Sequence, residues 1–215
     1  MACEIVNPQV AAISRNRHCM YLRDVLILNR IRMSPNIQPT LSNEKVFLYP
    51  LQESDFESLY AVASDPQIWE QHPNKDRWKK EVFQTFFEGA MQSKGAFKIV
   101  AQETGKVIGC TRFYDYDPQE NSILVGYTFY ATDQWGKGVN RSVKTLMLDY
   151  IFQFVSKVCL HVGSQNVRSQ VAVGRIGAAK TGEQEVTYFG ETPKLNFVYT
   201  IEKEKWQAMH PKGQL

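Results

Sequence analysis

The sequence has no apolar run long enough to cross a membrane. The apolar run nearest the N-terminus, residues 25–28, reads VLIL, whereas a membrane-spanning helix needs ~20 apolar residues. This run also lacks the small-residue cleavage pattern of a secretory signal peptide. We therefore expect a protein that does not associate with membranes, is not secreted and resides in the cytoplasm.

Cysteine is scarce, and its spacing does not suggest a metal site. The four cysteines, Cys3, Cys19, Cys110 and Cys159, form no Cys-x-x-Cys pair, and the four histidines are scattered. This pattern lacks the ligand spacing of zinc sites, so no metal is expected. Cys110 and Cys159 lie in apolar, strand-like runs, which is typical of buried free thiols in a reducing compartment.

The chain also lacks a basic domain. Its net charge of +3 arises in residues 1–32, which hold five arginines against two acidic residues, so the remainder has 20 basic and 20 acidic residues. Domains that bind nucleic acid usually show a basic face or stripe, so we expect no nucleic-acid partner.

The first 32 residues differ from the rest in pattern as well as in charge. They show no clear periodicity and precede Met33, and the following segment with Pro35 and Pro39 is typical of an extended lead-in. Either Met33 is the natural start, or these residues are a loosely attached extension. We therefore predict a basic N-terminal extension over residues 1–32 and a single domain over residues 33–210.

From Lys45 onward, hydrophobic periodicity alternates between strand and helix. Helices are predicted at residues 53–63, 76–93, 139–155 and 167–176. Strands are predicted at residues 46–49, 96–102, 107–114, 122–130, 157–162, 185–189 and 197–201. This order indicates one domain of the α/β (α+β) class.

A glycine-containing junction is the most informative local feature. The predicted strand 122–130 leads through Trp135-Gly136-Lys137-Gly138 directly into the helix predicted at 139–155. The first turn of a helix has unpaired amides and a partial positive charge, and glycine lets a phosphate approach them closely. Lys137 and Arg141 add positive charge. The alternative is a loop that only connects the two elements.

This junction resembles the pyrophosphate loop of the GNAT superfamily of N-acetyltransferases. The P-loop and dinucleotide-binding glycine patterns are both absent. In the branch of this superfamily that includes RimJ and RimL, a Gly-Tyr pair precedes Trp-Gly-x-Gly and a long helix, and here the pair is Gly126-Tyr127. The last loop position, usually small in that branch, is Asn140, which is a good residue for a helix start.

A second motif supports the resemblance, which covers about residues 46 to 197. Asn166-Val167-Arg168-Ser169, followed by Arg175-Ile176-Gly177-Ala178, matches the Asn-x-x-Ser and Leu-Gly-Ala motifs of that branch in order and spacing. In the family, the asparagine contacts the pantetheine arm. Taken by itself, Asn166 is simply a helix cap.

The resemblance implies the GNAT acyl-CoA N-acyltransferase fold, a mixed, mostly antiparallel, strongly twisted sheet of about seven strands with about four helices. It also implies acetyl transfer from acetyl-CoA, as co-substrate, to a primary amine of a small molecule or a protein N-terminus, by direct attack in a ternary complex. A homodimer is a reasonable expectation. The alternatives are a catalytically silent acyl-CoA-binding module and, less favoured, a nucleotide- or sugar-phosphate-binding α/β domain.

The residues implied to contact the cofactor lie at the strand end, in the loop and at the second motif. They are Phe129, Tyr130, Trp135, Gly136, Lys137, Gly138, Val139, Asn140, Arg141 and Asn166. In the family, the backbone at the positions of Phe129 and Tyr130 holds the pantetheine arm and polarises the thioester carbonyl. A placed amide donor stabilises the tetrahedral oxyanion that amine attack creates.

The resemblance leaves the acid and base roles open. Relatives often carry a glutamate where this chain has Leu124-Val125 and a tyrosine where it has Val173. Ser169 and Tyr127 are the candidates to protonate the thiolate, although a cap and a packing residue are the plainer interpretations. Acidic residues in turns that could serve as the base are Asp115, Asp117 and Glu120.

The acceptor pocket is implied to lie between the first two helices and the last strands. The aromatic and histidine residues of that region are Trp69, His72, Trp78, Phe83 and Phe87. Aromatic residues at helical spacing are more often core residues than ligand contacts. His72 lies in a loop-like Gln-His-Pro segment, so an exposed histidine without special function is expected.

Overall fold

The computed structural model describes residues 34–211. Pro35–Leu215 is one compact unit. The predicted extension over residues 1–32 lies outside the described residues, so it stays a prediction.

The core of the domain is an eight-stranded sheet with the order β1-β2-β3-β4-β5-β6-β8-β7. The strands are β1 Leu41–Ser42, β2 Val46–Pro50, β3 Ala96–Ala101, β4 Val107–Asp117, β5 Ser122–Tyr130, β6 Lys157–Gly163, β7 Ala179–Val186 and β8 Lys194–Glu202. Only the β5–β6 pair is parallel, and every other neighbouring pair is antiparallel. The predicted mixed, mostly antiparallel sheet is confirmed.

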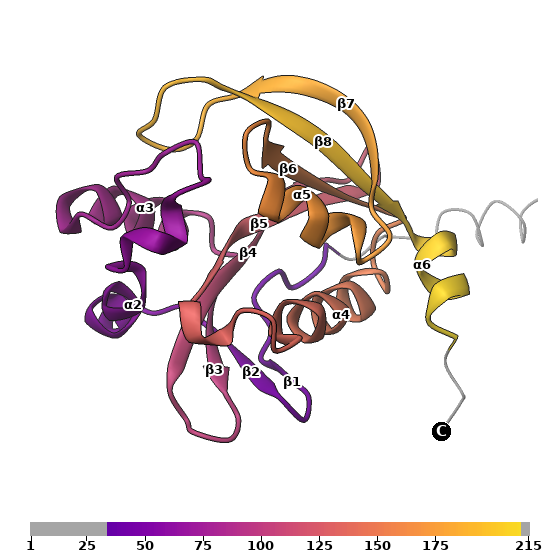
Figure 1. The fold of residues 1–215 in the computed structure, drawn as a ribbon. Coiled ribbons are helices and arrows are strands. Elements are labelled where there is room, and N and C mark those ends of the chain that lie inside the picture. Colours follow the sequence, from indigo (N-terminus) through magenta and orange to yellow (C-terminus); the bar gives the residue numbers. More distant parts are fainter. Residues whose placement is uncertain (1–33, 212–215) are drawn as a thin grey trace, which may run out of the picture. The chain divides into compact units, whose positions relative to one another are not determined.

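Helices cover both faces of the sheet (Figure 1). They are α2 Phe56–Ala63, α3 Lys80–Gln92, α4 Val139–Ile151, α5 Val167–Gly174 and α6 Lys203–Met209, with 3-10 turns η1 Glu53–Asp55, η2 Pro66–Trp69 and η3 Thr132–Gln134. Two cores result, because α2 and α3 pack with Cys110 and Phe129 on one face, while α4 packs with Ile123 and Val125 on the other. Over residues 34–211, no helix combines the length and the apolarity that a bilayer crossing requires.

The four helices predicted from periodicity are confirmed, but the strand predicted at 185–189 is wrong. The observed strand is β7, which pairs with β8 from Ala179 to Val186, and residues 187–193 connect the two. β7 is an edge strand whose residues are almost all exposed. It therefore has no buried face and no apolar alternation that the sequence could reveal. Helix α6, which buries only Trp206, also went unpredicted.

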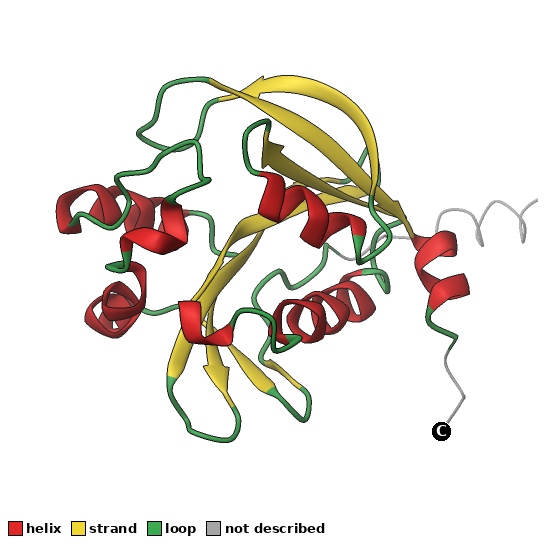
Figure 2. Ribbon diagram, viewed as in Figure 1, coloured by secondary structure: helices red, strands yellow, loops and turns green. Residues whose placement is uncertain are grey.

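The parallel pair β5–β6 opens into a wedge. The two strands are bridged only from Ser122↔Lys157 to Leu124↔Cys159, yet β5 continues to Tyr130 and β6 to Gly163. The register of β5 against β4 shifts between Cys110 and Arg112, and Tyr127 within that shift has a φ of 51°. A bulge bends its strand, so it accounts for the divergence of β5 from β6, which is visible in Figure 2.

Candidate functional site

A cavity of about 840 Å³ occupies the wedge and the space in front of it. Two parts of its lining differ in how they are built. The first is the glycine loop, residues 134–141, which leads from β5 into α4. The second is the aromatic pocket, formed by Trp69, Tyr114, Tyr127, Phe129 and Tyr188.

The glycine loop presents main-chain amides without protein acceptors. Gly136 and Gly138 adopt left-handed φ values of 75° and 78°, and no described side chain caps the start of α4. Among the described residues, the Gln134, Trp135 and Lys137 amides have acceptors, which are the carbonyls of Ala131, Thr132 and Gln134. The amides of Gly136, Gly138, Val139, Asn140 and Arg141 have no acceptor there. Free amides at a helix start form an anion-binding geometry.

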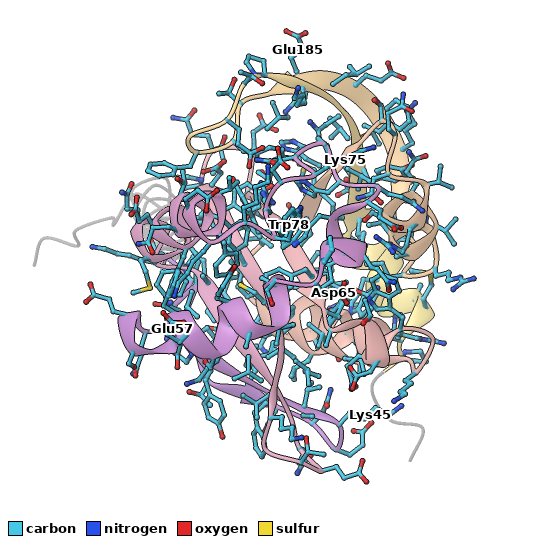
Figure 3. All side chains as sticks on the ribbon, turned by 60° about the vertical axis from the view of Figure 1, so that its left-hand side comes forward. Lys45, Glu57, Asp65, Lys75, Trp78 and Glu185 are labelled. Carbon is cyan, nitrogen blue, oxygen red and sulfur yellow. The ribbon has the colours of Figure 1, made fainter. Side chains whose placement is uncertain are left out.

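Three cations surround these amides. Lys137 and Arg141 are exposed within the loop itself. Lys45, labelled in Figure 3, brings its Nζ to 3.7 Å from the position that a Cβ on Gly138 would occupy. Nothing in the sequence pointed to Lys45, because it lies far from the loop along the chain and only the β2–α4 packing brings it close.

Hydrogen bonds tie the loop to its neighbours. Trp135 Nε1 donates to the Tyr130 carbonyl at 3.3 Å, and the Tyr130 hydroxyl donates to Asn140 Oδ1 at 3.1 Å. Thr132, in η3 just before the loop, donates to Asp65, the N-cap residue of η2 that is labelled in Figure 3, at 2.9 Å. The Arg168 guanidinium lies 4.1 Å from the centre of the Trp135 ring. The loop conformation is therefore held from both faces of the sheet.

The end of β5 directs one free amide toward the wedge. The Ala131 amide donates to the Ile108 carbonyl at 2.8 Å, and Phe129 is paired with Cys110 on β4. Amides alternate sides along a strand, so the Tyr130 amide points away from β4 and toward β6. Phe129 belongs to the core formed with α2 and α3 and is also part of the cavity lining.

The second sequence motif forms the opposite wall. Asn166 Oδ1 accepts a hydrogen bond from the Ser169 amide at 3.0 Å, so its role as the cap of α5 is observed. Asn166, Arg168 and Ser169 all line the cavity. Val173, at the position where relatives carry a tyrosine, is buried and lines it as well.

The aromatic pocket is centred on Tyr127. Its ring makes edge contacts with Tyr114 at 5.0 Å and Tyr188 at 5.4 Å, and the Arg112 guanidinium lies 3.8 Å from the ring centre. Burial raises the pKa of the Tyr127 hydroxyl, and Arg112 opposes the shift. The hydroxyl therefore keeps its proton at neutral pH.

A buried ion pair closes this pocket. Arg77, with 3% of its side chain exposed, donates from Nε to Glu191 Oε1 at 3.0 Å and from Nη1 to His72 Nε2 at 3.1 Å. Glu191 belongs to the β7–β8 connection, so the pair fastens this connection to the segment before α3. Burial, followed by the charge of Arg77, lowers the pKa of His72 well below 6.5.

The structure corrects the expected environment of the acceptor residues. His72 is half-buried and lines the cavity, so the prediction of an exposed histidine is wrong. Trp69 lines the cavity, while Phe83 and Phe87 are core residues outside its lining and Trp78 is 38% exposed on the surface. The three candidate bases, Asp115, Asp117 and Glu120, also lie outside the cavity lining. Asp115 is exposed, Asp117 accepts a hydrogen bond from the Gln119 amide, and Glu120 pairs with Lys157.

A buried lysine in the cavity lining was not predicted. Lys144 Nζ donates to Thr128 Oγ1 at 2.6 Å and to Thr111 Oγ1 at 3.1 Å. Burial lowers its pKa to about 7. The sequence offered no signal for it, because a lysine in an amphipathic helix is normally assigned to the solvated face. Across the described part of the chain, no group of three or more histidine, cysteine or acidic residues could hold a metal ion.

Comparison with known proteins gives consistent matches. A family model described as the acetyltransferase (GNAT) domain matches residues 45–179. Among solved structures, a GCN5-related N-acetyltransferase from Brucella melitensis superposes with a TM-score of 0.69 at 18% identity, covering 80% of this chain and 82% of that chain. RimJ from Mycobacterium smegmatis, in complex with CoA-disulfide, gives 0.63 at 16% identity, covering 84% and 93%.

A third solved structure is the spermidine N-acetyltransferase from Vibrio cholerae in complex with CoA and spermine. It superposes with a TM-score of 0.57 at 18% identity, covering 76% of this chain and 99% of that chain. Identities this low establish a shared fold and leave the acceptor undetermined.

Proposed function

This chain belongs to the GNAT acetyltransferase family, and from that premise we propose that it is an N-acetyltransferase acting on a primary amine. The amine belongs to a small molecule or to a protein N-terminus, and acetyl-CoA is the acetyl donor. The observation that carries the proposal is the set of free amides in the glycine loop, next to a parallel strand pair that opens into a wedge.

The glycine loop is the proposed site for the CoA diphosphate. The amides of Gly136, Gly138, Val139, Asn140 and Arg141 have no acceptor among the described residues, and they lie at the positive end of the α4 dipole. The side chains of Lys137, Arg141 and Lys45 supply balancing charge. Trp135 and Asn140 hold the loop against Tyr130.

The wedge is the proposed channel for the pantetheine arm and the thioester. The Tyr130 amide faces the wedge and would donate to the thioester carbonyl, while Phe129 and Asn166 line the two walls. An amide donor aimed at the developing oxyanion stabilises the tetrahedral intermediate, and holding the amine against the carbonyl supplies most of the remaining acceleration.

The aromatic pocket is the proposed acceptor site. The amine attacks as the neutral form, and the CoA thiolate takes up a proton as it leaves. Ser169 and Tyr127, the two predicted proton donors, both line the cavity. The wall at Val125 and Val173 carries no carboxylate or phenol, so the rate would depend mainly on positioning.

Calorimetry with acetyl-CoA, followed by thiol release with an amine panel, tests this proposal. The panel contains amino acids, polyamines, aminoglycosides and peptide N-termini. We expect acetyl-CoA to bind and at least one amine to be acetylated. Binding without turnover on any amine would favour the silent acyl-CoA-binding module, and stabilisation by nucleotides but not by CoA would favour a nucleotide-binding domain.

Two further parts of the proposal are tested separately. A homodimer would give an elution volume for about twice the 24.7 kDa chain mass in size-exclusion chromatography with light scattering. A cytoplasmic location would be checked by fractionation of the native host, with recovery in the membrane fraction contradicting it.

A further inference from the structure

Lys144 is a buried cation without an anionic partner. It lies on α4 beneath the bulge of β5, has 5% of its surface exposed and lines the cavity. Within the described part of the chain, its ammonium donates hydrogen bonds only to the hydroxyls of Thr128 and Thr111, at 2.6 and 3.1 Å. Among the described residues, no carboxylate forms an ion pair with it, although Lys98, Lys157 and Arg77 each have one.

The groups that face Lys144 do not compensate its charge. Cys110 on β4 is the titratable group whose charge acts on it, and burial raises the pKa of that thiol to about 12, so the thiol stays neutral. Tyr130 on β5 is also buried, and its pKa is raised, so it stays neutral too. On α4 itself, Arg141 is a second cation, one helical turn away. A lysine placed in this way destabilises the fold.

Thr128 connects this lysine to the cavity. Its hydroxyl lies 2.6 Å from Lys144 Nζ, and Thr128 lines the wedge on β5 next to the bulge residue Tyr127. Thr111 is fully buried and is not part of the cavity lining, so Thr128 is the hydroxyl of this pair that a ligand in the cavity could reach. The Thr128 hydroxyl also lies 2.9 Å from Thr111 Oγ1 and donates to the Gly126 carbonyl at 3.2 Å. Lys144 and Thr128 thus form a hydrogen-bonded chain that ends at a residue of the cavity lining.

We propose that Thr128 donates the proton that the departing CoA sulfur takes up, and that Lys144 restores the proton on Thr128. This inference rests on the proposed acetyl transfer. As the amine nitrogen bonds to the carbonyl carbon, the C–S bond breaks and its electron pair goes to sulfur. Sulfur takes the Thr128 hydroxyl proton, and Thr128 takes one from the Lys144 ammonium. The acetylated nitrogen releases a proton to solvent, and solvent recharges Lys144.

This path differs from the two donors predicted from the sequence. Tyr127 packs against Arg112 and two tyrosines on the acceptor side of the sheet, and Ser169 lies at the start of α5, where its amide is bound by the cap residue. Over residues 34–211, neither side chain has a hydrogen bond to a group that could return a proton to it. Lys144 acts through Thr128, so it is a positioning residue, and its pKa of about 7 suits proton exchange at neutral pH.

The test compares Lys144→Met, Thr128→Val and Ser169→Ala with Lys157→Met as the control. Lys157 is on β6 and pairs with Glu120 at 3.2 Å, so its removal deletes a lysine charge outside the site. The first readout is the ultraviolet absorbance of the CoA thiolate bound to each variant as pH is varied. In the wild type, the ammonium should lower the thiol pKa relative to free CoA. In Lys144→Met, the pKa of the bound CoA thiol should return to that of free CoA or exceed it.

The second readout is the pH profile of kcat. We expect the wild-type kcat to fall as pH rises and Lys144 loses its proton. Lys144→Met and Thr128→Val should lower kcat about 100-fold and remove this alkaline fall, in the range usual for acid–base groups. The double variant should be no slower than Lys144→Met, because the residues act as a unit. Lys157→Met should match the wild type in both readouts.

The outcomes separate this inference from the proposed function. If the wild type fails to bind acetyl-CoA, the proposed function is overturned. If it binds and turns over, but Lys144→Met and Thr128→Val keep the wild-type thiol titration and pH profile, only the inference is overturned. It is equally overturned if Ser169→Ala alone removes the alkaline fall. Should Lys144→Met fail to fold, Thr128→Val still gives both readouts.

Discussion

The glycine loop and the aromatic pocket line the same cavity, but they are built in opposite ways. The loop is one contiguous stretch whose proposed function depends on backbone conformation, with two left-handed glycines and five amides that have no acceptor among residues 34–211. The pocket gathers side chains from η2, β4, β5 and the β7–β8 connection, and it depends on the buried Arg77–Glu191 pair. If the proposed function holds, donor binding resides in local geometry, whereas acceptor selection depends on tertiary packing.

The largest effect is expected from a substitution that disrupts the aromatic pocket and leaves the glycine loop intact. Arg77→Met removes the partner of a buried carboxylate, which costs about 3–5 kcal/mol when the survivor stays unpaired. We expect the free energy of unfolding in urea to fall by about that amount, the KM for the amine to rise at least tenfold and the affinity for acetyl-CoA to change less than twofold. An equal loss of acetyl-CoA affinity would show that the two parts are not independent.

A matched control for this variant is Lys80→Met. The Lys80–Glu57 pair has a similar separation of 2.7 Å, but its side chains are 53% and 72% exposed. Exposed pairs contribute about 0–1 kcal/mol. This variant should leave stability nearly unchanged, which would assign the effect at Arg77 to burial.

The second largest effect is the pH dependence of stability that Lys144 causes. Burial lowers its pKa from 10.5 to about 7. Between these values the unfolded chain binds one proton more than the folded chain, so stability rises with pH by up to ~1.4 kcal/mol per pH unit. The loss of stability caused by burying Lys144 is at its full value below about pH 7, and it disappears near pH 10.5, the pKa of this lysine in the unfolded chain.

Urea unfolding at pH 7.5 and 9.5 measures this penalty. The wild type should gain on the order of 2–3 kcal/mol across that interval from Lys144, and Lys144→Met should lack this gain. The variant should also be more stable than the wild type at pH 7.5, because removing a buried unpaired charge is favourable. Parallel pH curves for the two proteins would contradict the assignment.

The same contrast explains what the sequence could predict. The glycine loop, the cap at Asn166 and the long helices each follow from residues that are near one another in the chain. The predicted helices are confirmed, and the structure shows the cap and the left-handed glycines. Lys45, Arg77, Glu191 and Lys144 escaped prediction because their importance arises only when distant elements meet. The edge strand β7 was predicted at the wrong residues, because a strand exposed on both faces has no hydrophobic period.

The third effect would break the loop and spare the pocket. Gly138 has a φ of 78°, and a branched residue there is strained by about 1–2 kcal/mol and crowds the amides around it. Gly138→Val should weaken acetyl-CoA binding about 30-fold or more by calorimetry, with the fold retained. Gly105→Val is the control, because Gly105 has a φ of 67° and open surroundings in the β3–β4 turn. Unchanged affinity in Gly138→Val would reject the diphosphate site.

The smallest effect tests how far side chains contribute within the loop. Trp135 donates from Nε1 to the Tyr130 carbonyl at 3.3 Å and stacks with Arg168 at 4.1 Å, yet it is 38% exposed. An exposed cation–π contact is worth about 0.5–1 kcal/mol, so Trp135→Ala should weaken acetyl-CoA binding about three- to fivefold. Trp135→Phe keeps the stacking and removes the Nε1 donor, so its affinity for acetyl-CoA should lie between those of the wild type and Trp135→Ala. If Trp135→Ala instead matched the loss in Gly138→Val, donor binding would depend on side chains as much as acceptor binding does, and the contrast between the two parts would no longer hold.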